Sequence, residues 1–300
     1  MENSDLQMSN DRQLNTIAAL FAAHQNAEIV KYSPEKRCLL QVTKSDVEYF
    51  VKVYPKKFLQ NERGAKIHSV GLYLWQLSQA EKVNFVVPKP VCWDENTRTI
   101  WQEKLAGVPA IAKLKSGDGR EIVFEIGRAI AAISQLKIAP PRCFDRREQS
   151  KDTYDYAAKI LSFAPLFEHS VLEVLNSLAR AHDRLPPEKL APVHGDMHID
   201  QWLFDGERLG LLDFEDFSSG ETERELAFFV VQLEAEYGGK VSVNDLFVEL
   251  IKGFCEDGRK INQLSLNFYA AQKWLAKASK GDAKSAERFV EKARQCLEFV

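Results

Sequence analysis

Two aspartates beside a predicted hairpin are the residues of this chain best placed for catalysis. Two short apolar segments, 201–204 and 209–212, are separated by a turn that contains Asp205-Gly206. An Asp-Gly turn between apolar segments is a strong hairpin signal. Asp196 precedes the first segment and Asp213 follows the second, 17 positions later. Because a hairpin holds its two ends side by side, we expect the two carboxylates to lie at one mouth of the hairpin.

Phosphoryl transfer is the reaction that fits this arrangement. It needs a carboxylate that orients the acceptor hydroxyl and takes its proton, and oxygen ligands that hold Mg²⁺ on the nucleotide phosphates. In protein kinases the catalytic loop supplies an Asp and, five residues later, an amide ligand, and a second Asp follows the next strand. Gln201 comes five positions after Asp196, and Asp213 follows the predicted strand. The spacing therefore predicts Asp196 as the catalytic residue and Gln201 and Asp213 as Mg²⁺ ligands.

The segments 194–198 (His-Gly-Asp-Met-His) and 212–215 (Leu-Asp-Phe-Glu) resemble the motifs of the aminoglycoside phosphotransferase and choline kinase family. The resemblance implies an α+β, bilobal protein-kinase-like fold, with a small antiparallel β lobe and a larger, mainly helical lobe. It also implies ATP- and Mg²⁺-dependent phosphorylation of a hydroxyl on a small molecule: a sugar, an amino sugar or an amino alcohol. His194 and His198 join Asp196 as expected catalytic-loop residues. His194 would brace the loop, and His198 would face the phosphate or the acceptor.

The motif departs from the family pattern at two positions. Gln201 stands where the family usually has Asn, which resembles the maltokinase-like sugar kinase branch, and Glu225 stands where the family usually has Asp. Gln carries the same amide oxygen on a longer stem. The departures keep open a catalytically silent nucleotide-binding or scaffold protein, although Lys52, Asp196 and Asp213 are all present. A protein kinase is less favoured, since no Ala-Pro-Glu-type segment follows the motif.

The N-terminal part resembles a nucleotide-binding lobe. Alternating apolar residues predict an antiparallel meander of three strands, over 28–32, 37–42 and 47–54. Lys52 in the third strand resembles the kinase lysine that contacts the α- and β-phosphates; a solvated edge lysine is the alternative. A helix over about 61–79 follows, and Glu62 in its first turn is the candidate ion-pair partner of Lys52. Glu62 could instead only stabilise the helix N-terminus.

Residues 102–108 resemble the hinge between the lobes. In the family the hinge backbone binds the adenine edge, so Glu103, Lys104 and Leu105 are named as nucleotide-binding residues by position alone. An ordinary strand end is the alternative. The expected division is a nucleotide-binding lobe over 1–104 and a catalytic and acceptor-binding lobe over 105–300.

The second lobe is predicted to be mainly helical. Apolar residues follow helical spacing over 121–136, 154–161, 171–182, 225–237, 243–254, 261–278 and 283–299. The acidic segment after Asp213 could receive a cationic or polyhydroxyl acceptor, or it could be a solvated loop; it contains Glu215, Asp216, Glu221 and Glu223. Three helical aromatic residues could stack on a sugar or belong to the core: Tyr237, Tyr269 and Trp274.

The composition of the chain limits which binding partners and which cellular compartment are expected. The net charge is -3 with 28% charged residues, so neither nucleic acid nor an anionic membrane is an expected partner. The five cysteines are scattered and form no Cys-x-x-Cys pair, which argues against a zinc site and a disulfide framework. No apolar run is long enough to span a membrane. These features predict a soluble, unprocessed, cytoplasmic protein, and they leave the oligomeric state open.

Overall fold

The computed structural model describes residues 12–24, 26–33, 36–55, 62–117 and 119–298. The chain divides into two compact units. The first comprises Met1–Lys82 and Val86–Ala106, and the second comprises Val83–Phe85 and Gly107–Val300. The division falls two residues beyond the predicted one, and the segment Val83–Phe85 crosses over to the second unit.

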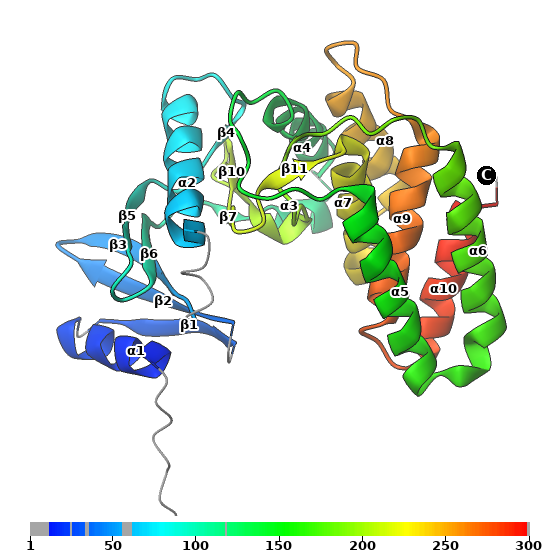
Figure 1. Ribbon diagram of the computed structural model, residues 1–300. Helices are drawn as coiled ribbons and strands as arrows, with labels where there is room; N and C mark the ends of the chain where they lie inside the picture. The colour runs from blue at the N-terminus through cyan, green and yellow to red at the C-terminus, as the bar shows by residue number, and fades with distance from the viewer. Residues whose placement is uncertain (1–11, 25, 34–35, 56–61, 118, 299–300) are drawn as a thin grey trace, which may run out of the picture. The chain divides into compact units, whose positions relative to one another are not determined.

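The first unit is built on a five-stranded antiparallel sheet of order β1-β2-β3-β6-β5 (Figure 1). The strands are β1 (Glu28–Ser33), β2 (Arg37–Lys44), β3 (Val47–Val53), β5 (Pro90–Asp94) and β6 (Thr99–Glu103). The predicted three-stranded meander is confirmed as β1 to β3. Leu40 lies opposite Val51, and Cys38 lies opposite Val53, so the alternating apolar residues of β2 and β3 share one buried face.

One helix packs on each face of this sheet. The helices are α1 (Arg12–Ala23) and α2 (Arg63–Gln79). Ile17 of α1 joins the apolar face formed by β2 and β3. Ile67 of α2 packs with Tyr54 and Ile100 on the opposite face. Lys52 lies opposite Ile100 in the sheet register, and it alternates with Val51 and Val53. It therefore lies on the face that α2 covers.

The second unit contains two small sheets. Four short strands pair in the order β4-β10-β9-β7, and two more pair as β11-β8. Their bounds are β4 (Phe85–Val86), β7 (Val108–Pro109), β8 (Ala191–Val193), β9 (Trp202–Phe204), β10 (Leu209–Leu211) and β11 (Ser218–Gly220). Strands of two or three residues carry too little alternation to be recognised in the sequence, and β7, β8 and β11 were not predicted.

The predicted hairpin is confirmed by β9 and β10, which pair antiparallel. Its turn is longer than a two-residue Asp-Gly turn, because the last paired residues are Phe204 and Leu209. The Asp205 carboxylate accepts hydrogen bonds from the backbone N–H groups of Glu207 at 2.9 Å and Arg208 at 2.7 Å. The aspartate side chain thus closes the turn locally.

Helices make up most of the second unit (Figure 1). Their bounds are α3 (Ala110–Lys115), α4 (Gly119–Ile133), α5 (Arg146–Phe163), α6 (Glu168–Arg184), α7 (Thr222–Tyr237), α8 (Val243–Phe254), α9 (Gln263–Ala278) and α10 (Ala283–Cys296), with 3₁₀ turns η2 (Pro165–Phe167) and η3 (Ile199–Gln201). All seven predicted helices are present, and α3 was missed. Helix α5 starts well before the predicted residue 154, because the Asp145 side chain caps it by accepting from the Glu148 N–H.

Two glycines let α4 and α8 cross closely. A β-carbon on Gly253 would overlap the carbonyl oxygen of Phe124, and one on Gly127 would overlap that of Leu250. The backbones of the two helices are therefore in direct contact. The five cysteines are free thiols. Within the described ranges, the chain has no helix of the length and apolarity needed to cross a membrane.

Candidate active site

The predicted catalytic loop starts where β8 ends, at His194, Gly195 and Asp196. Gly195 has a φ of 88°, and a β-carbon there would overlap the backbone oxygen of Asp216. Only glycine satisfies both constraints without strain. The close approach also shows that the loop with Asp196 packs directly on the segment that follows Asp213.

Glu225 of α7 holds the backbone of this loop. Its side chain is buried (1% exposed), and its two carboxylate oxygens accept hydrogen bonds from His194 N at 2.9 Å and Gly195 N at 3.0 Å. Burial raises the pKa of the Glu225 carboxyl, while the charges of His194 and Arg224 and the two N–H donors act in the opposite direction. The sequence marked Glu225 only as a departure from Asp, but its longer side chain still makes both contacts.

His194 links the loop to the end of the hairpin. Its side chain is fully buried, and Nε2 lies 2.8 Å from the carbonyl oxygen of Leu212. Because a carbonyl only accepts, Nε2 carries the proton. The backbone N–H of Leu212 in turn donates to the backbone carbonyl oxygen of Gln201 at 2.9 Å. His194 therefore holds Leu212, the residue before Asp213, in place. Because its side chain is fully buried, it acts by positioning this segment and not by contact with a substrate.

Asp196 is half exposed, with 50% of its side chain accessible. His198 Nε2 lies 3.7 Å from its carboxylate, a contact longer than a hydrogen bond. Interaction with His198 lowers the pKa of Asp196 to about 2, and the charges of Lys273 and His194 act in the same direction against desolvation. The carboxylate is therefore ionised at neutral pH and open to an incoming hydroxyl group.

Gln201 and Asp213 offer one amide and one carboxylate oxygen. The amide nitrogen of Gln201 contacts His198 Nε2 at 3.2 Å, which leaves the amide oxygen for a hard cation. Asp213 has a φ of 63°, a left-handed conformation that Asp tolerates better than most residues. Among the residues that the structure describes, no three His, Cys, Asp or Glu side chains gather into a metal site. The donor set fits Mg²⁺, which commonly takes one or two protein ligands and completes its shell with phosphate and water.

In the first unit, Lys52 is buried (7% exposed) within β3. It is therefore no solvated edge lysine. Glu62 is the N-cap residue of α2, exposed and left-handed with a φ of 57°, and its side chain makes no capping hydrogen bond. The expectation that Glu62 lies in the first helical turn is wrong, because the helix starts at Arg63. Helix α2 contains no Asp or Glu, so Glu62 remains the acidic residue nearest to it in sequence.

The expected hinge residues are already engaged by their neighbours. The backbone N–H of Glu103 donates to the carbonyl oxygen of Lys89, and that of Lys104 donates to the carbonyl oxygen of Glu48, both at 2.9 Å. The side chains of the same pairs form ion pairs at 2.7 and 3.0 Å. Of the three backbone N–H groups named by position, only that of Leu105 makes no backbone hydrogen bond to the described residues.

The acidic segment after Asp213 does not form a free anionic surface. Glu221 is buried and accepts two hydrogen bonds of 2.7 Å from Arg146 and one of 2.5 Å from the Tyr269 hydroxyl. Glu223 accepts from the backbone N–H of Asn262 at 3.0 Å. Asp216 forms an ion pair with Arg142. The first of the two interpretations, a site for a cationic acceptor, is therefore wrong for these three residues.

The helical aromatic residues have structural contacts as well. Tyr269 and Trp274 are buried in the core, at 1% and 3% exposure. Tyr237 donates its hydroxyl to Asp200 at 2.8 Å, and burial together with this bond raises the pKa of Tyr237 to about 12. Tyr269 and Trp274 therefore offer no stacking face for a sugar, and the Lys115 ammonium lies over one face of the Tyr237 ring, 5.1 Å from its centroid.

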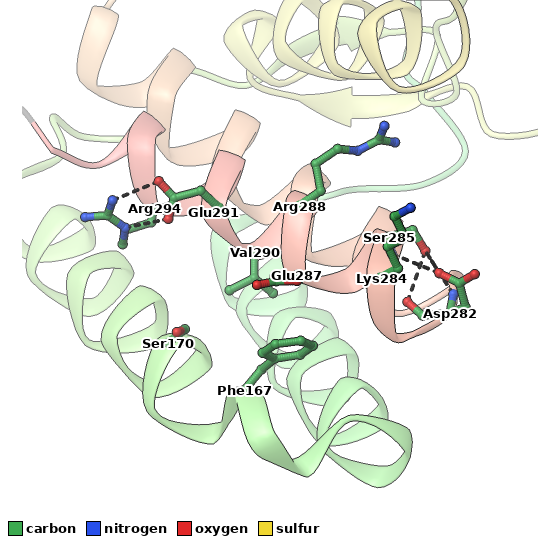
Figure 2. A pocket seen from close by; sticks show the side chains of 10 residues that line it. All are labelled: Phe167, Ser170, Asp282, Lys284, Ser285, Glu287, Arg288, Val290, Glu291 and Arg294. Atoms are coloured by element: carbon green, nitrogen blue, oxygen red, sulfur yellow. Dashed lines mark hydrogen bonds and ion pairs between the residues drawn. The ribbon is translucent and has the colours of Figure 1, made fainter.

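A pocket of about 640 Å³ lies elsewhere in the second unit, between the start of α6 and helix α10. Figure 2 shows Phe167 and Ser170 on one side and Val290 on the other, with the Glu291–Arg294 ion pair at one end. No catalytic-loop residue lines this pocket, so it is not part of the candidate site.

A family model described as "Phosphotransferase enzyme family" matches residues 35–260. No curated protein sequence matches the chain significantly. Solved structures match over nearly the whole chain. A structure of the amicoumacin kinase hAmiN with AMP-PNP, Ca²⁺ and Ami has a TM-score of 0.67 at 12% identity, covering 96% of this chain and 93% of that one.

Two choline kinase structures match similarly. A choline/ethanolamine kinase family protein from Mesorhizobium loti has a TM-score of 0.64 at 17% identity, covering 95% of both chains. Choline kinase LicA from Streptococcus pneumoniae has a TM-score of 0.65 at 13% identity, covering 96% of this chain and 99% of its own. At such identities these structures establish the fold, which is protein-kinase-like, and the family model establishes the family. The chain belongs to the phosphotransferase enzyme family and is a small-molecule kinase.

Proposed function

We propose that the protein transfers the γ-phosphoryl group of Mg-ATP to a hydroxyl group of a small molecule. The observation that carries the proposal is the state of Asp196: an ionised, half-exposed carboxylate on a loop held by Glu225 and His194. The amide of Gln201 and the carboxylate of Asp213 follow at the spacing that phosphoryl transfer requires. Relatives of the same fold were solved with AMP-PNP and with ADP, which supports a nucleotide as the second substrate.

Each residue has a proposed task. Asp196 orients the acceptor hydroxyl and takes its proton. General-base catalysis of this kind accelerates a reaction by about 10²- to 10⁴-fold. Gln201 and Asp213 hold the metal, which would supply charge neutralisation on the phosphates. Lys52 binds the phosphates. Leu105 N–H donates to the adenine edge.

His198 and Glu62 have further proposed roles. His198 contacts both Asp196 and Gln201, so it orients the two functional side chains with respect to each other. Glu62 stays the candidate partner of Lys52. The opposing hypothesis, a catalytically silent protein, loses one argument, because Glu225 keeps both backbone contacts in spite of the departure from Asp.

The test is ADP formation from Mg-ATP with a panel of sugars, amino sugars and amino alcohols, to which the sequence resemblance leads. Sugars come first because of the resemblance of Gln201 to the maltokinase-like loop. We expect turnover that depends on an acceptor and falls about 10²- to 10⁴-fold in Asp196→Asn while nucleotide affinity is kept. The exposed Asp183→Asn is the control. Full activity of Asp196→Asn would remove the role assigned to it.

A further inference from the structure

Three cationic side chains and two aromatic rings alternate beside the catalytic loop. The Arg142 guanidinium lies 4.6 Å from the ring centroid of Phe144, and Arg224 lies 4.5 Å from the same ring. Arg224 also lies 4.2 Å from the ring of Phe228, on which the Lys273 ammonium sits at 4.3 Å. We call these five residues the cation ladder. Cation–π contacts of this kind fix the position of charges that would otherwise repel one another.

The cation ladder is joined to the backbone of the catalytic loop. Arg224 NH1 donates to the carbonyl oxygen of Gly195 at 3.3 Å and lies 3.8 Å from Glu225. Its side chain is only 6% exposed, and its Nε is buried without a partner in the structure. Arg142 pairs with Asp216, whose backbone packs on Gly195. The ladder thus holds its cations next to Asp196.

Lys273 is the end of the ladder that lacks a counter-charge. No carboxylate among the described residues lies within 4.0 Å of its ammonium, and no described group accepts a hydrogen bond from it. The residue is half-buried, but its Nζ is not one of the polar atoms sealed from solvent. The ammonium is therefore open to a ligand, and a negatively charged ligand would supply the counter-charge that it lacks.

The surroundings of Lys273 are positive. Burial lowers the pKa of Lys273 to about 8, and Arg224, Lys277 and Lys280 lower it further, while Asp196 acts against them. Lys273 and Lys277 are four residues apart, which places them on one face at the end of α9, and Lys280 follows in the turn after this helix. Lys277 is neutralised by Glu236 at 2.8 Å. Glu221, Glu223 and Asp216 of the acidic segment are engaged by other partners.

We infer that the acceptor carries an anionic group, a carboxylate or a phosphate, and that Lys273 binds this group while Asp196 faces the hydroxyl. The inference rests on the proposed phosphoryl transfer and specifies its substrate class. An acceptor that carries an amine near the reacting hydroxyl would face Lys273 and Arg224 with like charge. An anionic acceptor would complete the pairing that Lys273 lacks.

The test uses four glucose derivatives that differ in charge: D-glucose, D-glucosamine, D-glucuronate and D-glucose 6-phosphate. Calorimetric titration into the protein saturated with Mg-AMP-PNP blocks binding of the phosphate at the nucleotide site. We expect glucuronate, glucose 6-phosphate or both to bind about 10- to 100-fold more tightly than glucose, as a charge-assisted contact allows. Comparison of the two anions shows which group the site takes.

Variants assign the effect to Lys273. Lys273→Met is expected to remove the preference for the anion, and Lys273→Glu to shift the preference towards glucosamine, while Mg-AMP-PNP affinity is kept. Lys252→Met, an exposed lysine of α8, is the control and should keep the preference. If Lys273→Met lowers the overall stability, the more conservative Lys273→Arg must restore anion binding.

Equal affinity for the four sugars, tighter binding of glucosamine, or an unchanged anion preference in Lys273→Met would overturn the inference. Turnover with glucosamine but with neither anion would overturn it and leave the proposed phosphoryl transfer intact. Loss of Mg-AMP-PNP binding by the wild-type protein, or full turnover by Asp196→Asn, would instead count against the proposed function itself.

Discussion

At the scale of single residues, Asp196 depends on contacts made by the two residues before it. His194 and Gly195 give their backbone N–H groups to Glu225, and the His194 ring reaches Leu212 at the end of β10. Gly195 allows the loop to lie on the backbone of Asp216. A short loop can therefore present a charged group at a fixed place, because the backbone N–H groups of His194 and Gly195 are both bonded to Glu225.

The first prediction concerns Glu225. In Glu225→Gln one carboxylate oxygen becomes an NH₂ group, which faces a backbone N–H and leaves that donor unsatisfied in the interior. We expect a loss of unfolding free energy of about 1–3 kcal/mol and a lower kcat with KM for ATP nearly unchanged. Chemical denaturation and steady-state kinetics measure the two effects. Glu225→Asp keeps both oxygens and is the matched control; equal behaviour of the two variants would contradict the assigned role.

The second prediction concerns pH. The pKa of Asp196 is lowered to about 2, so this carboxylate stays ionised between pH 4 and 8 and produces no inflection of kcat in that range. His198→Ala removes the main cause, and the pKa should then rise towards the ordinary value of 3.8. The pH profile of kcat from 4 to 8 for both proteins checks this. A wild-type acid limb near pH 5 that moves to another pH in Asp196→Glu would show that the carboxyl titrates there and contradict the prediction.

At the scale of elements, a buried ion pair joins the helices around the site. Arg146 at the start of α5 binds Glu221 beside α7 in bidentate fashion, and Tyr269 of α9 donates to the same carboxylate. Arg146 NH1 also donates to the Pro186 oxygen at 2.7 Å. Burial, followed by the interaction with Glu221, raises the pKa of Tyr269 far above its ordinary value, so the tyrosine remains a donor. This network connects three helices to the segment before the catalytic loop.

The third prediction follows from this network. Arg146→Met leaves the Glu221 carboxylate buried with only one hydrogen bond, so we expect a loss of about 3–5 kcal/mol in unfolding free energy. Arg120→Met breaks an exposed pair with Asp245 and should cost less than about 1 kcal/mol. Urea denaturation compares the two. Addition of Glu221→Gln to Arg146→Met should restore part of the loss; no recovery would show that burial of the unpaired charge is not its cause.

Local patterns in the sequence predicted the elements well. The alternation of β1 to β3, the hairpin of β9 and β10 and the seven longer helices follow from residues close together in the chain. The partners of the polar residues could not be predicted from such local patterns. Glu221 and Arg146 are 75 positions apart, and the cation ladder joins residues from 142 to 273. Such contacts depend on helix packing, although the four-residue spacing of Lys273 and Lys277 could have marked a cationic face.

At the scale of the whole molecule, the two units divide the expected tasks. Lys52 and the engaged hinge residues belong to the first unit, and Asp196, Gln201 and Asp213 belong to the second. The solved phosphotransferase structures align over 95–96% of the chain and so include both units. The division into a nucleotide-binding and an acceptor-binding part stays a prediction, as does the cytoplasmic location.

The fourth prediction is that nucleotide and metal stabilise the protein together. At about 100 times its Kd, Mg-AMP-PNP should add about 2.7 kcal/mol to the stability, because a ligand that binds only the folded state shifts the equilibrium. The increase in Tm should be smaller when EDTA replaces Mg²⁺ and in Asp213→Asn, while the exposed Asp257→Asn should behave like the wild type. A Tm that responds equally with and without Mg²⁺ would argue against the metal role of Asp213.

The most direct test of the central claim is transfer of label from [γ-³²P]ATP to a small-molecule acceptor, measured for the wild type, Asp196→Asn and Asp183→Asn. We predict that the wild type and Asp183→Asn label the acceptor at similar rates. Asp196→Asn should do so about 10²- to 10⁴-fold more slowly, with unchanged nucleotide affinity. Label transfer at the wild-type rate by Asp196→Asn would contradict the assignment of Asp196 as the group that takes the proton of the acceptor.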